Sequence, residues 1–325
     1  MLEINTNTER NVTLMKKLDF IFDTDIGADC DDVMALAYLV YAKRNLNIDL
    51  KAVLISNGCE YGASAIRAIF EELGEEIPPI GSPAREIKAY NGYTKELAER
   101  FGTIKEPVSA PNSVKVMREA LVNSTDAVIC AVGAFTNVAA LLESEPDEIS
   151  DLNGVELVRQ KCAQVVLMAG IFDPNNERVE WNIHLDIPAT QKVVELCPVD
   201  LLFLPSETGI NVFTGKPAIE KYGNTNSLVA SFLSRKDVRE KNCRPSWDPL
   251  TAIYSVEGEG AFFEVTGYGK ITVTDEGKST FEKCEGSKHR IIYLKGVGTE
   301  QEMTTRKLAA DYIDTCALTV YDTKK

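Results

Sequence analysis

The sequence has little histidine and no paired cysteines, and both shortages argue against the common structural metal sites. Its 325 residues include two histidines, two tryptophans and eight cysteines. The cysteines are spread singly, without a Cys-x-x-Cys pair, so neither a zinc site nor a disulfide framework is indicated. Several lie inside apolar runs, where a buried, reduced thiol is expected.

Basic residues are outnumbered, and long apolar runs are missing. There are 35 Lys and Arg residues against 49 Asp and Glu residues, a net charge of −14. A field of that sign repels polyphosphate and anionic lipid. No run approaches the roughly 18 apolar residues of a membrane span, and the N-terminal segment lacks the basic and apolar regions of a signal peptide. We therefore expect a cytoplasmic protein that has neither nucleic acid nor membrane as a partner.

Short apolar runs alternate with helical patterns from residue 18 onward. The predicted strands 18–22, 51–55, 127–132 and 164–168 are each followed by a helical pattern, at 33–40, 63–73, 136–142 and 188–196. Such repeats favour an α/β fold with an open, mainly parallel sheet flanked by helices. A strand at 201–204, mostly helical structure over 206–260, a hairpin at 265–281, a strand at 290–294 and a helix from Thr304 complete the prediction. No linker composition divides the chain, so we expect an N-terminal extension, 1–17, and one catalytic domain, 18–325.

The loop after the first predicted strand is strongly acidic. The run Asp23-Thr-Asp-Ile-Gly-Ala-Asp-Cys-Asp-Asp32 contains five carboxylates. Ligands of open α/β sheets bind beyond the carboxyl ends of the strands, where this loop lies. Helix capping needs one or two acids, whereas clustered hard oxygen ligands suit Ca²⁺ or Mg²⁺. The spacing is not that of an EF-hand. The run therefore predicts a divalent cation site.

Five further segments follow in order, each after a predicted strand or at the start of a helix. They are Ser56-Asn57, Val132-Gly-Ala-Phe-Thr-Asn137, Val166-Leu-Met-Ala-Gly170, Glu180-Trp-Asn182 and Trp247-Asp-Pro249. Together with the acidic loop they resemble the motifs of the nucleoside hydrolase family, in particular its inosine-uridine preferring members. The resemblance implies the nucleoside hydrolase fold and Ca²⁺-dependent hydrolysis of the N-glycosidic bond of ribonucleosides to ribose and free base, in nucleoside salvage.

The resemblance also implies roles for individual residues. The calcium ligands are Asp25, Asp32, Asp248 and the backbone carbonyl of Val132, and Asp25 is also the general base. The substrate-binding residues are Asp31, Asn57, Met168, Glu180, Asn182 and Trp247. Of these, Asp31, Asn57 and Asn182 match residues that bind the 2′ and 3′ hydroxyls, and Glu180 matches one near the 5′ hydroxyl. The expected assembly is a homo-oligomer, either a dimer or a tetramer.

Three departures from the family pattern bear on the substrate. Trp247 stands where many members carry a histidine that protonates the departing base. A purine-preferring branch also has tryptophan there, which slightly favours purine nucleosides, with Tyr90 or Tyr93 as a second aromatic contact. Pro174 replaces the usual asparagine on the 5′ side, and the acidic loop is two residues longer than usual, with no counterpart for Asp29. A modified nucleoside or another N-riboside therefore stays open.

Two other functions fit parts of the sequence. A haloacid-dehalogenase-like phosphatase also has Asp-x-Asp after its first strand, as in Asp23-Thr-Asp25, although the following Ile26-Gly-Ala departs from its usual Gly-Thr. A non-catalytic ribose- or nucleoside-binding protein of the same fold would keep the metal and sugar ligands without turnover.

Overall fold

The computed structural model describes residues 17–324 and is built around a ten-stranded sheet. The strand order is β11-β10-β12-β6-β5-β4-β1-β2-β3, with β9 also paired to β12. The strands are β1 (Leu18–Thr24), β2 (Ile48–Ile55), β3 (Ile80–Gly81), β4 (Ala127–Ala131), β5 (Cys162–Met168), β6 (Asp200–Leu204), β9 (Phe263–Val265), β10 (Gly269–Val273), β11 (Ser279–Lys283) and β12 (His289–Leu294). Pairing is parallel from β3 through β12 and antiparallel for β9, β10 and β11. The predicted α/β fold with a mainly parallel sheet is confirmed.

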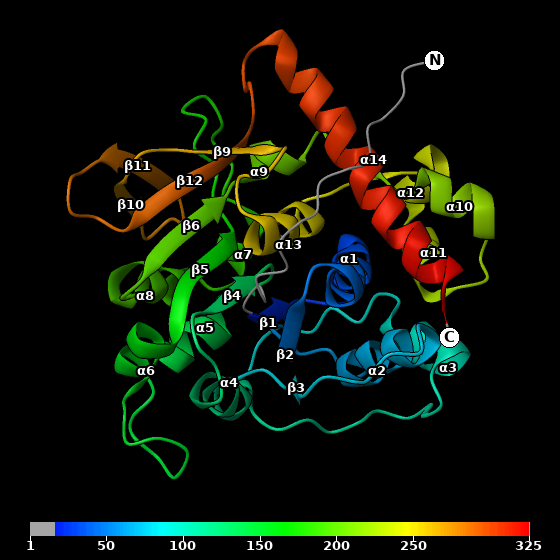
Figure 1. Ribbon diagram of the computed structural model, residues 1–325, viewed down its shortest axis with the longest axis horizontal. Helices are drawn as coiled ribbons and strands as arrows, with labels where there is room; N and C mark the ends of the chain where they lie inside the picture. The colour runs from blue at the N-terminus through cyan, green and yellow to red at the C-terminus, as the bar shows by residue number, and fades with distance from the viewer. Residues whose placement is uncertain (1–16, 325) are drawn as a thin grey trace, which may run out of the picture.

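Helices cover both faces of the sheet (Figure 1), because its central strands are apolar on both sides. In β1, Phe20 and Phe22 pack into one core and Ile21 into the other. The first core contains side chains of α1 (Asp31–Asn45), α2 (Gly62–Glu72), α3 (Thr94–Phe101), α11 (Ser227–Ser234), α13 (Asp248–Glu257) and α14 (Glu300–Asp322). The second contains those of α4 (Ser113–Val122), α5 (Thr136–Leu142), α6 (Gly154–Lys161), α7 (Trp181–Leu185) and α8 (Ile187–Leu196).

Five short elements lie in the sequence between β6 and α13. They are α9 (Ser206–Gly209), β7 (Phe213–Thr214), α10 (Lys216–Tyr222), α12 (Lys236–Lys241) and β8 (Arg244–Pro245), of which β7 and β8 form a separate two-stranded sheet. All eight cysteines are free, as expected. In the part of the chain that the structure describes, no helix combines the length and hydrophobicity that a bilayer crossing requires.

Two predicted boundaries are wrong, each for a local reason. The hairpin begins at Gly269, not at residue 265, because Phe263–Val265 pairs with β12 instead of with β11. The last helix begins at Glu300, four residues before Thr304, since the side chain of Thr299 caps it by accepting a hydrogen bond from the amide of Gln301. The predicted extension 1–17 lies outside the described residues except for Lys17, and the single domain stays a prediction.

The parallel strands bring their following loops together at one edge of the sheet. The amide of Ser56 donates to the carbonyl of Thr24 at 2.9 Å, and the amide of Val132 donates to the carbonyl of Asp23 at 2.8 Å. A Cβ atom on Gly133 would lie 2.3 Å from Ser56 Oγ and 2.7 Å from Asp25 Cβ. Glycine at this position therefore permits the loop after β4 to approach the acidic loop.

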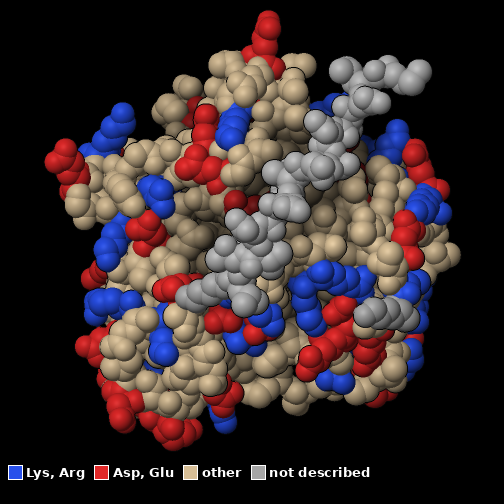
Figure 2. Space-filling view, in the orientation of Figure 1, with Lys and Arg blue, Asp and Glu red and all other residues tan. Residues whose placement is uncertain are grey.

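The surface carries both signs of charge. On the face drawn in Figure 2, acidic and basic side chains of the described residues are interspersed. That face therefore gives no support to a polyanionic partner.

Candidate active site

A cavity of about 460 Å³ opens where the loops after β1 and β5 meet α7 and α13. Its volume suits a small organic ligand. Eight of the ten predicted site residues line it: Asp25, Asp31, Val132, Met168, Glu180, Asn182, Trp247 and Asp248. The other two, Asp32 and Asn57, contact or neighbour these residues without lining the cavity.

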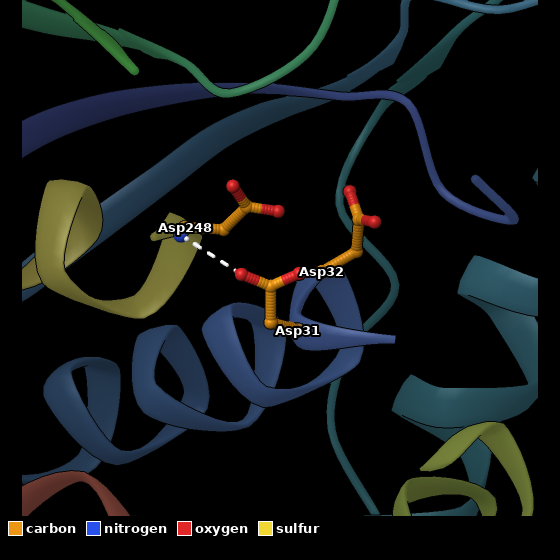
Figure 3. A group of neighbouring side chains, drawn as sticks. All are labelled: Asp31, Asp32 and Asp248. Carbon is orange, nitrogen blue, oxygen red and sulfur yellow. Dashed lines mark hydrogen bonds between the residues drawn. The ribbon is translucent and has the colours of Figure 1, made fainter. Parts of the chain in front are cut away.

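Three aspartates from two distant parts of the sequence lie close together at this cavity (Figure 3). Carboxylate oxygens of Asp31, Asp32 and Asp248 all lie within 4.8 Å of one another. Asp31 and Asp32 open α1, and Asp248 opens α13, so two helix N-termini meet at the cluster. One oxygen of Asp31 accepts hydrogen bonds from the amides of Trp247 at 3.0 Å and Asp248 at 3.2 Å. These bonds join the first βα unit to α13.

The carboxyl groups of this cluster are buried, and within residues 17–324 none of them forms an ion pair with a lysine or arginine. Burial raises the pKa of Asp31, Asp32 and Asp248. Nearby carboxylates raise it further, with Asp29 acting on Asp31 and Asp31 acting on both Asp32 and Asp248. Thr24 donates to one oxygen of Asp32, and the other oxygen is buried without a hydrogen-bond partner among residues 17–324. Buried anions are stable only when paired or bound to metal, and these donors are hard oxygens. The cluster therefore fits a divalent cation.

Asp25 and Asp31 also belong to this acidic region, and their roles as calcium ligand and sugar-binding residue stay predictions. Within the described residues, Asp31 is grouped with Asp32 and Asp248. Asp25 is only 4% exposed and lines the same cavity. Burial and the negative charges of Asp29 and Asp31 raise its pKa. The side-chain amide nitrogen of Asn57 fixes the backbone of Asp25, because it donates to the carbonyl of Asp25 at 2.6 Å.

The opposite side of the cavity is built on β5 and α7. Glu180 caps α7, and its oxygens accept from the amides of Asn182 at 2.9 Å and Ile183 at 3.1 Å. Burial raises the pKa of Glu180 to about 7. The side-chain amide of Asn182 donates to the carbonyls of Val132 at 2.8 Å and Met168 at 3.0 Å. These bonds tie α7 to the ends of β4 and β5.

Aromatic side chains line the cavity above the acids. The indole nitrogen of Trp247 donates to the carbonyl of Ser206 at 2.8 Å, and Gly209 gives the ring room, since a Cβ there would lie 2.4 Å from Trp247 Cδ1. Of the two tyrosines considered, Tyr90 lines the cavity, whereas Tyr93 is buried and binds the acidic loop. Trp181, 49% exposed, packs edge-on against Tyr90 at 5.8 Å between ring centroids.

Residues 20–308 match the family described as inosine-uridine preferring nucleoside hydrolase. The chain belongs to this family. The predicted family and enzyme class are thereby confirmed, and family and fold support hydrolysis of the N-glycosidic bond of nucleosides.

Solved structures of other nucleoside hydrolases share the fold. The inosine-uridine preferring enzyme of Bacillus anthracis has a TM-score of 0.68 at 18% identity, over 92% of this chain and 99% of that chain. The purine-preferring ribonucleoside hydrolase of Gardnerella vaginalis has a TM-score of 0.67 at 14% identity, over 92% of this chain and 99% of that chain. A plant nucleoside hydrolase has a TM-score of 0.66 at 17% identity, over 90% of this chain and 98% of that chain. Comparison with curated protein sequences gave no match.

The geometry of this nucleoside hydrolase does not support the phosphatase alternative. The nucleophile that a phosphatase would need, Asp23, is 0% exposed and does not line the cavity. One of its oxygens accepts from the side-chain amide of Asn137 at 2.9 Å. Asp23 therefore links the end of β1 to α5.

Three arginines of this nucleoside hydrolase were missed by the sequence analysis. Arg178, Arg235 and Arg244 line the cavity alongside the predicted residues. Arg178 lies two residues before Glu180, whose motif could have drawn attention to it. Arg235 and Arg244 lie in the region 206–260, where the sequence gave only a mostly helical pattern.

Proposed function

We propose that the protein hydrolyses the N-glycosidic bond of ribonucleosides with Ca²⁺ as cofactor, and that purine nucleosides are slightly favoured. One observation carries the proposal: buried aspartates of α1 and α13 form an oxygen-rich cluster in a cavity that also holds Asn182, Glu180 and Trp247. The family resemblance further supports a cytoplasmic homo-oligomer, either a dimer or a tetramer. Light scattering would measure the mass of this assembly.

The proposed calcium ligands are Asp25, Asp32, Asp248 and the carbonyl of Val132. A Ca²⁺ ion held by these residues would lower the pKa of a bound water molecule and would offer coordination positions to ribose hydroxyls. Asp31 adjoins these ligands, and one of its oxygens is already fixed by two backbone amides. Its other oxygen is the one we assign to a ribose hydroxyl.

Asp25 would act as general base. It takes a proton from the attacking water while the water oxygen bonds to C1′. The electron pair of the C1′–N bond leaves with the base, which takes up a proton from solvent. The carboxylates around the cavity stabilise the positive charge that develops on the sugar in an oxocarbenium-like transition state.

The base would lie against the aromatic side chains. Trp247 offers an indole surface that suits flat heterocycles, and Tyr90 and Trp181 line the same cavity. A tryptophan cannot protonate the leaving group, so stacking and solvent must replace the histidine of other members. This composition supports the proposed preference for purines.

A reducing-sugar assay over inosine, guanosine, adenosine, uridine and cytidine tests the proposal. Ribose should be released fastest from purine nucleosides, should stop when a chelator is added and should resume with excess Ca²⁺. If Ca²⁺ and ribose bind by calorimetry but no nucleoside is cleaved, the non-catalytic binding alternative is supported instead.

A further inference from the structure

The acid that lengthens the loop after β1, Asp29, belongs to an ion-pair network at the cavity. Its carboxylate accepts from Arg244 Nε at 3.0 Å and from Arg244 Nη2, and Arg235 Nη1 lies 3.5 Å from Asp29 Oδ1. Asp237 pairs with both arginines, at 2.9 Å from Arg244 Nη1 and 3.2 Å from Arg235 Nε. Two acids and two arginines thus form a closed ring that joins the β1–α1 loop to α12 and β8.

The ring holds the Arg244 guanidinium against Trp247. The central carbon of the guanidinium lies 5.3 Å from the centroid of the Trp247 ring, and both side chains line the cavity. Trp247 itself is fixed by the hydrogen bond to Ser206 and by the close approach of Gly209. A base that packs against Trp247 therefore lies beside a positively charged group whose position is set on two sides by carboxylates.

Counting donors shows that Arg244 has capacity left for a ligand. A guanidinium has five N–H bonds. Asp29 accepts from Nε and from Nη2, and Asp237 accepts from Nη1. One N–H on each terminal nitrogen therefore remains without a partner among residues 17–324. The remaining N–H groups on the two terminal nitrogens can serve two acceptors of one ligand, such as O6 and N7 of a 6-oxopurine.

We propose that Arg244, positioned by Asp29, contacts the departing base and makes the enzyme selective for 6-oxopurine ribosides, an inference that rests on the hydrolysis proposed above. As the C1′–N9 bond breaks, its electron pair moves onto the purine, and N–H donors at O6 and N7 stabilise that charge. The guanidinium keeps its proton, and the base is protonated by solvent. Adenine places an amino donor where O6 would be, so it loses this stabilisation.

The test compares leaving groups in the Arg244→Gln variant. Removing the donors should lower kcat/KM for inosine by about 100-fold or more, as for loss of other transition-state donors. Adenosine should lose about tenfold or less, because it has only one of the two acceptors. Hydrolysis of p-nitrophenyl riboside should change by less than about threefold, since p-nitrophenolate leaves without help.

Two further variants separate chemistry from folding. Arg244→Lys keeps the charge and a partner for Asp29 but lacks the fork, so it should fold and still lose the preference for inosine over adenosine. Arg244→Ala should regain inosine hydrolysis when millimolar guanidinium is added. Arg239→Gln is the matched control: Arg239 is exposed on α12, donates to the carbonyls of Leu233 and Ser234 and does not line the cavity. It should leave all three rates unchanged.

Asp29 is tested as a positioning residue. Asp29→Asn should lower kcat for inosine more than it raises KM, and Asp29→Glu should restore part of the loss. A role limited to loop stability would instead affect inosine and p-nitrophenyl riboside equally.

The outcomes distinguish the two proposals. If the wild-type protein cleaves none of the ribosides in Ca²⁺, the proposed function is wrong and this inference falls with it. If the wild-type protein cleaves them but Arg244→Gln slows inosine and p-nitrophenyl riboside equally, only the assignment of Arg244 is overturned. Equal preference for inosine and adenosine in the wild-type protein would also overturn it.

Discussion

Replacing Asp248 with asparagine should stabilise the protein in the absence of a cation and remove its stabilisation by Ca²⁺. Oxygens of Asp31, Asp32 and Asp248 lie within 4.8 Å of one another. At an effective dielectric constant of about 20, two full charges at that distance repel by about 3.5 kcal/mol, so Asp248 takes part in about 7 kcal/mol of repulsion. Because burial raises the three pKa values, bound protons relieve part of this cost. We expect a net gain of about 2 to 4 kcal/mol in Asp248→Asn.

Thermal unfolding followed by circular dichroism measures both effects. In chelator at about pH 8, the Tm of Asp248→Asn should exceed that of the wild type by roughly 3 to 6 °C. Ca²⁺ at about 100 times its Kd should stabilise the wild type by about 2.7 kcal/mol and the variant by much less. Asp151→Asn, an exposed residue between α5 and α6, provides the control and should show neither effect.

Two results would refute the reasoning. A variant that is less stable than the wild type in chelator would show that Asp248 is a satisfied structural group and not one of three repelling anions. An equal Ca²⁺-induced rise in Tm for both proteins would place the cation elsewhere.

Three other predictions concern the base, the aromatic wall and pH. Asp25→Asn should lower kcat by at least about 100-fold while ribose-like inhibitors still bind by calorimetry, and near-normal turnover would refute its role as base. Trp247→Ala should slow purine nucleosides more than p-nitrophenyl riboside; equal losses would exclude stacking as its role. Burial raises the pKa of Asp314 from 3.8 to about 6, so its protonated form stabilises the fold and this contribution is lost as pH rises from about 4 to about 6. Asp314→Asn should therefore be about 3 kcal/mol more stable than the wild type at about pH 8, but not at about pH 4, in urea unfolding.

The parallel strands could be predicted because burial on both faces leaves an uninterrupted apolar run. Phe20–Phe22 and Val165–Met168 are such runs, and they form the buried parts of the predicted strands 18–22 and 164–168 within β1 and β5. The sequence analysis missed α3 and α4, whose apolar positions are diluted by charged residues. It also missed β7 and β8, because two residues are too few to show a periodicity of two.

Most of the candidate site could be predicted because the carboxyl ends of parallel strands share one edge. That rule and the family motifs predict that Asp25, Val132 and Asn182 lie close together, and all three line the cavity. Neither the rule nor the motifs indicated Arg244, because its ion pair with a residue 215 positions away leaves no spacing to detect. Arg244 looks in the sequence like any other basic residue of a mixed segment.

The acidic loop shows why residue type alone does not assign a role. Its acids end in different environments: Asp31 and Asp32 join Asp248, Asp23 receives the Asn137 amide, and Asp29 pairs with arginine. Repulsion within the loop is therefore relieved in part by protein cations and amide donors. Among the described residues, Asp29 pairs with arginine, whereas Asp31, Asp32 and Asp248 form no ion pair, which leaves a metal ion to neutralise them. The arginine partner also explains how the loop can carry an additional acid. Asp29 still raises the pKa of its acidic neighbours, but it is paired with Arg244 and fixes that cation beside the surface where a base would lie.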